Sequence, residues 1–404
     1  MGQKVLREVR RMRFEELYER RLGGRLTVSE AADILGVDTR TFRRWSRRYE
    51  AEGAEGLVDG RIGMASHRQA SVDEVLEILN FFETRYFDFN VRHFHQKLKE
   101  NHGCTRSYSW VKNKLQEAGK IKKARSSGTH RLRRPRKPLP GMMLHQDGSK
   151  HEWVSGALWD LIVTFDDATS EIYSAFFVEE EGTMSSFKGI QEVIEARGLF
   201  CSLYTDRGSH YWLTREADGK VDKQSLTQVH RALKQLGIEL IPAYSPEARG
   251  RGERLFGTVQ GRWPQELRLA GIEDIEAANQ YLKTVLIGDF NREFKVRAIE
   301  EGSAFVPWIG HEQSLSDLLC VHEDRVVGKD NTVRYQNKML QIPSDKYRYH
   351  YVKAAVKVHE YPGGELAVFH GPRCLGRYSE AGVLLTEGIG AIAPAEALLG
   401  SQRS

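Results

Sequence analysis

Three stretches in the middle of the chain decide the fold: LHQDGSKHEW (residues 144–153), SLYTDRGSHY (202–211) and SPEARGRGERLFGTVQ (245–260). Each contains one carboxylate of interest, namely Asp147, Asp206 and Glu253. The two aspartates each close a short apolar run, which predicts positions at or beside strand ends, and Glu253 is predicted to open an amphipathic helix. Because Mg²⁺ prefers oxygen ligands, three carboxylates gathered by one fold indicate metal-assisted phosphodiester chemistry.

The composition indicates a basic front half joined to an acidic remainder. The 404 residues carry a formal net charge of +5, but residues 1–140 hold 31 Lys and Arg against 18 Asp and Glu, or +13, which leaves −8 for the rest. This asymmetry favours a polyanion partner, with nucleic acid as the leading candidate. The sequence contains neither an apolar run of about 20 residues nor a secretory signal, so we expect a cytoplasmic protein with no membrane partner.

Residues 24–50, GRLTVSEAADILGVDTRTFRRWSRRYE, predict a helix, a tight turn and a second helix. Thr27 and Glu30 fit a capping box, Gly36 suits the turn, and Asp38 can cap the second helix. The outward residues of that second helix are expected to contact DNA, as in a helix-turn-helix, and they are Arg40, Thr41, Arg43, Arg44, Arg47 and Arg48. An ordinary helical hairpin with a solvated basic face remains the alternative.

Two further segments extend the basic front. Helices are expected at 72–86, 91–100 and 107–118, the last carrying Lys112 and Lys114, which favours a second helical DNA-binding domain over a plain bundle. Residues 120–140 contain three prolines and no acidic residue, and indicate an extended linker that follows a phosphate backbone, with a merely flexible spacer as the alternative. The linker residues expected to contact DNA are Lys122, Lys123, Arg125, Arg131, Arg133, Arg134, Arg136 and Lys137.

From residue 141 the pattern changes to strands at 142–146, 158–165, 172–177, 202–205 and 239–243, with helices between the later ones. This order predicts a mixed α/β domain. Asp166 and Asp167 are interpreted as turn formers, and residues 179–181 as a solvated charge run. The short alternating strands after residue 310 predict a small β-barrel or sandwich. The expected domains are therefore 1–65, 66–119, the linker 120–140, a core at 141–309, a β domain at 310–380 and a tail at 381–404.

The three quoted stretches, in this order, resemble the catalytic core of the DDE transposases and retroviral-type integrases, and the basic helical front resembles bacterial insertion-sequence transposases, in particular the ISNCY group. The resemblance implies a ribonuclease-H-like core in which Asp147, Asp206 and Glu253 hold two Mg²⁺ or Mn²⁺ ions. It also implies binding of element ends and target DNA, end cleavage and strand transfer, an assembly of at least a dimer, and nucleoid association. Arg249, Arg251 and Arg254 surround Glu253 and are expected either to neutralise phosphates or to be solvated.

Each of the three acids also has an ordinary structural explanation. Taken singly, Asp147 and Asp206 are ordinary turn formers, and Glu253 is a charge that suits a helix start. A DNA-binding regulator with an inactive core, and a nuclease of the same fold that cuts without joining, are the competing functions.

Overall fold

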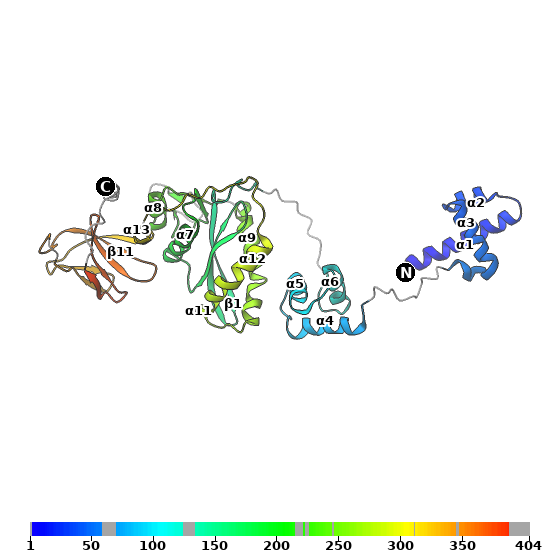
Figure 1. Ribbon diagram of the computed structural model, residues 1–404, viewed down its shortest axis with the longest axis horizontal. Coiled ribbons are helices and arrows are strands. Elements are labelled where there is room, and N and C mark those ends of the chain that lie inside the picture. Colours follow the sequence, from blue (N-terminus) through cyan, green and yellow to red (C-terminus); the bar gives the residue numbers. More distant parts are fainter. Residues whose placement is uncertain are drawn as a thin grey trace, which may run out of the picture. The chain divides into compact units, whose positions relative to one another are not determined.

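The computed structural model describes residues 2–58, 70–123, 134–214, 221–222, 226–244, 246–310, 312–344 and 347–387 (Figure 1). The chain divides into two compact units, Met1–Leu79 and Asn80–Ser404. Helix α4 (Val72–Thr84) begins in the first unit and ends in the second. None of the described helices is long and apolar enough to cross a membrane.

The first unit contains the predicted helix-turn-helix. Helix α1 (Gly2–Leu22) precedes α2 (Val28–Leu35) and α3 (Thr39–Glu52), and a 3₁₀ turn, η1 (Gly53–Leu57), follows. The capping box of Thr27 and Glu30 is present, and Asp38 caps α3 as predicted. Gly36 joins the two helices at φ 74°, a left-handed conformation that glycine adopts without strain. The buried side chains that hold the three helices together are Phe14, Leu17, Tyr18, Ala31, Ala32, Leu35 and Phe42.

The second unit contains a five-stranded mixed sheet in the order β3-β2-β1-β4-β7. Its strands are β1 (Leu144–Val154), β2 (Ala157–Asp166), β3 (Ile172–Val178), β4 (Ser202–Thr205) and β7 (Glu239–Pro242). The first three strands pair antiparallel, whereas β4 pairs parallel with both β1 and β7. This is the mixed α/β core that the sequence predicts.

Helices cover both faces of this sheet (Figure 1). Helices α7 (Thr183–Arg197) and α8 (Gln228–Gln235) pack on one face around Leu144 and Leu203. The other face is covered by α9 (Pro246–Gln260), α10 (Trp263–Leu269), α11 (Ile275–Tyr281), the π-helical turn η2 (Leu282–Leu286) and α12 (Ile287–Phe294). A short ribbon of β5 (Leu213–Thr214) and β6 (Val221–Asp222) follows β4.

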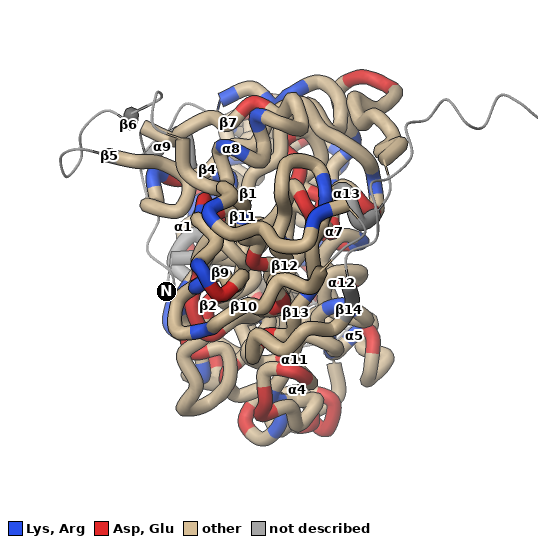
Figure 2. Tube along the Cα trace, turned by 90° about the vertical axis from the view of Figure 1, so that its left-hand side faces the viewer, with Lys and Arg blue, Asp and Glu red and all other residues tan. Residues whose placement is uncertain are grey.

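The C-terminal region forms an open sheet in the described residues. After α13 (Glu312–Leu318) come β8 (Val321–Val326), β9 (Thr332–Tyr335), β10 (Lys338–Gln341), β11 (Ala355–Glu360), β12 (Leu366–His370), β13 (Arg373–Tyr378) and β14 (Leu384–Glu387). The five-stranded order β14-β13-β12-β11-β8 leaves β14 and β8 as edges, and β9 and β10 form a separate ribbon. The expected barrel closure is therefore not seen, because alternation identifies half-buried strands but does not specify which distant strands pair. Acidic and basic residues are interspersed along these strands (Figure 2).

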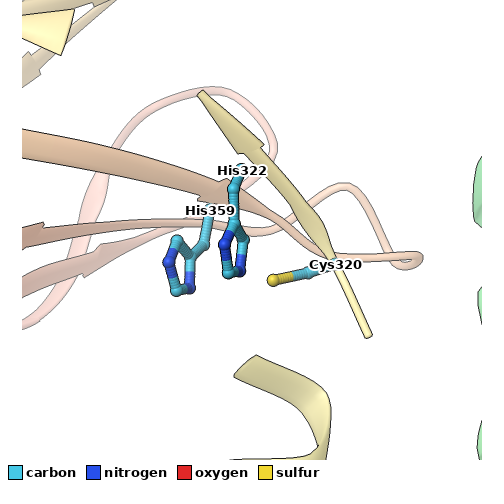
Figure 3. Close-up of side chains that lie close together, drawn as sticks. All are labelled: Cys320, His322 and His359. Carbon is cyan, nitrogen blue, oxygen red and sulfur yellow. The ribbon is translucent and has the colours of Figure 1, made fainter. Parts of the chain in front are cut away.

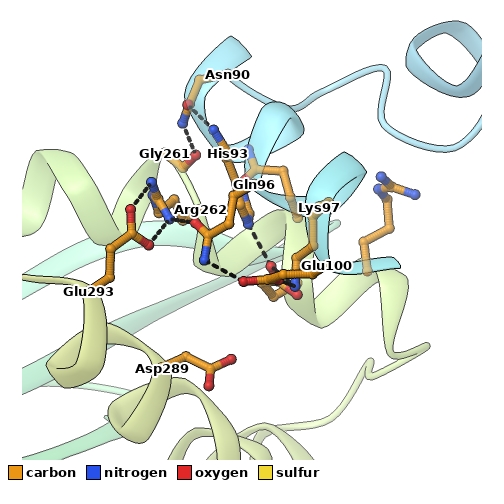
Figure 4. Close-up of polar contacts among 12 residues, drawn as sticks. Asn90, His93, Gln96, Lys97, Glu100, Gly261, Arg262, Asp289 and Glu293 are labelled. Atoms are coloured by element: carbon orange, nitrogen blue, oxygen red, sulfur yellow. Dashed lines mark hydrogen bonds and ion pairs between the residues drawn. The ribbon is translucent and has the colours of Figure 1, made fainter. Parts of the chain in front are cut away.

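Helices α5 (Val91–His102) and α6 (Tyr108–Glu117) complete the second unit, and α5 is held to the core by polar contacts (Figure 4). The Arg262 guanidinium donates to both carboxylate oxygens of Glu293, at 2.7 and 2.9 Å, and to Gln96 Oε1 at 2.8 Å. Asn90 Nδ2 donates to the Gly261 carbonyl at 2.8 Å. Gly261 lies in the short non-helical connection between α9 and α10.

Glu266 lies at the centre of this contact. Its Oε1 is 2.5 Å from His93 Nε2 and 2.7 Å from Lys97 Nζ. Burial alone would raise the pKa of Glu266, but the hydrogen bonds from His93 and Lys97 lower it. Burial lowers the pKa of His93, so the imidazole is neutral and Lys97 supplies the balancing charge. A buried carboxylate of this kind is costly to leave half-paired.

We predict that Glu266→Ala destabilises the second unit by about 3 kcal/mol, because Lys97 and His93 lose their partner in a buried site. Hydrogen exchange should show faster exchange of the amides of α5, together with a lower unfolding midpoint. The exposed Glu273→Ala is the matched control. Unchanged exchange in α5 would contradict a docking role for Glu266.

Candidate active site

The pairing of β1 with β4 brings two of the predicted carboxylates together. The parallel register pairs Leu144 with Leu203 and His145 with Tyr204. Continued by two residues along both chains, the same register leads to Asp147 and Asp206. Both aspartates are half-buried. They line one pocket, whose full lining is His145, Gln146, Asp147, Phe165, Tyr204, Thr205, Asp206 and Gly252.

The strand positions differ in detail from those predicted. Asp206 directly follows β4, as expected. Asp147 lies inside β1, because that strand continues to Val154 and pairs with β2 through Asp147 and Val163. The second half of β1 is polar and only half-buried, so the sequence does not suggest a strand there. The strand can continue because β4 ends at Thr205 and leaves that edge of β1 uncovered.

Glu253 lies on the neighbouring helix, near its middle. Helix α9 begins at Pro246, so the expected helix start at Glu253 is wrong, and so is the interpretation of its charge as a helix-start charge. Gly252 faces the pocket, since a Cβ there would lie 3.5 Å from Asp147 Oδ2. Glu253 itself is exposed. In the described part of the chain, the ligand atoms of the three acids are not all within 4.8 Å of one another.

A buried hydroxyl network supports the floor of the pocket. Tyr211 donates to Gln146 Oε1 at 2.9 Å and accepts from Ser186 Oγ at 3.1 Å. Burial raises the pKa of Tyr211 well above its usual value, and the nearby charges of Glu181, Asp206 and Asp147 add to this. Tyr211 is therefore a neutral hydrogen-bond donor that fixes Gln146, the residue before Asp147.

Glu181 is a nearby carboxylate that sequence reasoning missed. Glu179 and Glu180 are exposed, as a solvated charge run predicts, but Glu181 is half-buried. Its carboxylate packs where a side chain at Gly148 would otherwise lie, and its Oε1 is 3.5 Å from His210 Nε2. The glycine that follows Asp147 is the only sequence signal for this contact.

Asp167 is a buried hub rather than a simple turn former. It is fully buried, and its carboxylate accepts from His145 Nε2 at 2.8 Å, from Arg134 at 2.5 Å and from the Lys137 amide at 2.7 Å. Arg251 of α9 also donates to it. Burial would raise the pKa of Asp167, but the hydrogen bond from His145 and the other donors hold the pKa well below its usual range. One carboxylate thus joins β1, α9 and the end of the basic linker.

Several residues expected to contact DNA therefore make contacts within the protein. Arg134 and Arg251 bind Asp167, and Arg136 donates to the Asp167 carbonyl at 2.8 Å. Arg254 is exposed, as are Lys122 and Lys123. Lys112 and Lys114 of α6 and Lys137 are half-buried. The remaining expected residues lie outside the description: Arg125, Arg131 and Arg133 as whole residues, and Arg249 by its side chain.

Helix α3 presents the most coherent basic face. Its exposed basic residues are Arg40, Arg43, Arg44, Arg47 and Arg48, and Thr41 is half-buried. Phe42 is buried on the opposite side against Phe14, so the helix is fixed by an apolar stripe and exposes the arginines.

A separate group of Cys and His side chains, residue types that can bind metals, lies near the C-terminal sheet. Cys320, His322 and His359 place one ligand atom each within 4.8 Å of the others, and they are the sole such trio in the described residues (Figure 3). Cys320 Sγ and His322 Nε2 both contact the Asp317 carbonyl, at 3.2 and 2.8 Å. The two imidazoles stack at 3.8 Å with planes 8° apart. Imidazole lone pairs lie in the ring plane, so parallel rings cannot both point at one ion about 2 Å away. In this arrangement the cluster joins α13 to β8 and β11.

Comparison with known proteins finds relatives over most of the chain. The chain is 29% identical over 355 residues, 87% of its length and 77% of the relative, to a Sinorhizobium fredii protein described as a transposase, y4bF. It is 26% identical over 362 residues, 80% of its length and 76% of the relative, to the transposase for insertion sequence IS1202 of Streptococcus pneumoniae. The chain is similar to transposases over most of its length. Residues 6–58 match the family model of the homeodomain-like domain.

Solved retroviral structures give weaker similarity. The simian T-cell lymphotropic virus intasome in complex with the PP2A regulatory subunit B56 gamma aligns at 13% identity over 74% of this chain and 99% of that one, with a TM-score of 0.32. The HTLV-2 integrase catalytic core domain in complex with magnesium aligns at 15% identity over 36% of this chain and 85% of that one, with a TM-score of 0.28. At such scores neither alignment defines the fold, which follows from the strand order above.

We predict that Asp167→Asn destabilises this transposase-like core by about 3 kcal/mol at pH 7, because several cationic or donor groups lose a buried partner. The lowered pKa means that the stabilisation from Asp167 is complete above about pH 4, the unfolded value, and is lost as pH falls through the folded value. Chemical unfolding from pH 7 to pH 3 should therefore show a shallower loss of stability for Asp167→Asn than for the native chain. The exposed Asp324→Asn should behave as the native chain, and equal slopes for all three would contradict the assignment.

Proposed function

We propose that this protein is a DNA transposase that binds the terminal repeats of its element and catalyses metal-dependent end cleavage and strand transfer into target DNA. The observation that carries the proposal is the parallel register that sets Asp206 beside Asp147, in a pocket bordered by α9. The similarity to transposases over most of the chain supports it.

The residues of this pocket suit a divalent cation. Asp147 and Asp206 offer carboxylate oxygens, the donor type that Mg²⁺ and Mn²⁺ prefer, and both are partly open to solvent. Glu253 follows Gly252, which borders the same pocket, so a change of side-chain conformation is the simplest way for it to complete the ligand set. Two bound cations supply activation of an attacking oxygen and stabilisation of a leaving one.

The protein's own groups orient these acids. Tyr211 holds Gln146 through its hydroxyl, the Gly208 amide donates to Asp206 Oδ1 at 2.8 Å, and Asp167 fixes His145 and Arg251. Such support reduces the motion of a reacting group before DNA arrives. Water would attack first at the element end, and the freed 3′ hydroxyl would then attack target DNA in the same pocket.

The helical domains supply DNA binding. The exposed arginines of α3 are suited to phosphates and base edges in a major groove. Lys112 and Lys114 on α6 and the linker residues would extend the contact along the duplex. Because two element ends must be processed together, at least a dimer is expected, acting on nucleoid DNA in the bacterial cytoplasm.

We predict that Asp206→Asn abolishes cleavage and joining while duplex binding is unchanged, because it removes a cation ligand and leaves the helical domains intact. The assay uses Mg²⁺ or Mn²⁺ and DNA carrying the inverted repeats that flank the coding sequence. Glu180→Gln removes a nearby exposed charge and should retain activity.

The same assay separates the alternative functions. Cleavage without joining of precleaved ends would identify a nuclease. Neither reaction in the native chain, with tight duplex binding, would identify a regulator with an inactive core.

We predict that Arg47→Ala weakens binding to the terminal repeat. The negative slope of log affinity against log salt should become shallower by about 1, as expected for loss of one phosphate contact. Titrations of labelled duplex at several salt concentrations measure this slope. The control is Arg20→Ala, which removes an exposed arginine of α1 that pairs with Glu16. Equal slopes for the two variants would argue against α3 as the DNA-binding helix.

A further inference from the structure

The segment Tyr347–Lys353, with the sequence YRYHYVK, carries three tyrosine rings, two of which are exposed. The Tyr349 side chain is 94% exposed and Tyr347 is 61% exposed, whereas Tyr351 is 2% exposed. Tyr349 is the most exposed aromatic residue in the described chain. One tyrosine of the three thus lies in the C-terminal core, and the other two lie in solvent.

The buried tyrosine gives these rings a firm base. The Tyr351 amide donates to Asn331 Oδ1 at 2.7 Å, and the guanidinium of Arg348 lies 5.2 Å from the centre of the Tyr351 ring. Arg373 of β13 lies 4.0 Å from the centre of the Tyr347 ring. Since a ring held in place loses little freedom on binding, Tyr347 is suited to contact a ligand.

The surroundings of the two rings are basic. Arg348, His350 and Lys353 lie in the same segment, and the described residues 347–353 contain no acidic side chain. The β8–β9 turn, which carries the exposed Lys329, is tied to this segment because the Lys353 amide donates to the Val327 carbonyl at 3.0 Å. Asp330 of the same turn is an exposed carboxylate that accepts a hydrogen bond from the Thr332 hydroxyl at 2.7 Å, so the turn contributes one acidic group beside these cations. The surface thus combines exposed π-faces with cations.

We propose that Tyr347 and Tyr349, with Arg348, Lys353, Arg373 and Lys329, form a binding site for single-stranded DNA, in which unpaired bases stack on the tyrosines and the cations bind phosphates. Every base has a π-face, but in a duplex those faces are already covered by neighbouring bases. Exposed aromatic rings beside cations therefore favour unpaired strands.

The charge argues for this partner over others. A protein partner that covered the site would have to be acidic. Binding to a membrane surface requires a larger apolar area than two tyrosines provide. Strand ends that lose their complement during cleavage are DNA of the required kind. The site extends the proposed function, but it does not depend on the catalytic acids.

The test is fluorescence anisotropy of the full chain with a labelled thymidine homopolymer, compared with a duplex of the same length. Tyr349→Leu and Tyr349→Ala should weaken single-strand binding about fivefold or more, the effect of losing one stacked base. Tyr349→Phe keeps the ring and should bind as the native chain. Duplex binding should be unchanged in all three. Val383→Ala, at another exposed apolar position, is the control for loss of exposed apolar surface.

Three outcomes would overturn the proposal. They are native-like single-strand binding by Tyr349→Ala, equal weakening by Tyr349→Phe and Tyr349→Leu, and a change in sedimentation with unchanged oligonucleotide affinity, which would assign the surface to self-association. Failure of the transposase proposal is separate, because it is measured by the joining reaction of the native chain and Asp206→Asn.

Discussion

The short parallel contact between β1 and β4 is the constraint on which the candidate site depends. Only Leu144 and His145 pair with β4, yet this register determines where Asp206 stands relative to Asp147. The contact is held by apolar layers on both faces of the sheet, with Leu144 and Leu203 packed against α7 and α8. Because β4 stops at Thr205, the edge of β1 beyond it is open to solvent and available to polar ligands.

Asp167 fixes the position of α9 beside the candidate site. It is fully buried, and it gathers donors from β1, from α9 and from the segment that ends the basic linker. Arg134 and Arg251, which look like free phosphate ligands in the sequence, are thereby held in ion pairs within the protein. DNA would have to compete with Asp167 for them.

The sequence predicts the elements with strong local signals. Thr27, Glu30 and Asp38 mark the helix-turn-helix because capping depends on neighbouring residues. The apolar runs mark β2, β3, β4 and β7, but not the length of β1, whose polar half is a strand only because β2 pairs with it. The start of α9 was missed because glycine-rich SPEARGRG has low helix propensity, which packing on the sheet overrides. The burial of Asp167 and the position of Glu181 depend on residues far away in sequence, so no local pattern reveals them.

The docking of α5 onto the core also fixes the distance between the neighbouring helix α6 and the candidate site. Arg262, Glu266 and Gly261 hold α5 at a fixed place on the body that carries the candidate site. A DNA-contacting helix α6 next to it would therefore act as a ruler, since the bases it covers lie a constant number of steps from the scissile phosphate. One added base pair between them would turn the contacted groove by roughly 35° about the duplex axis. An element end would then be recognised by the spacing between the contacted bases and the cleavage site as well as by its base sequence.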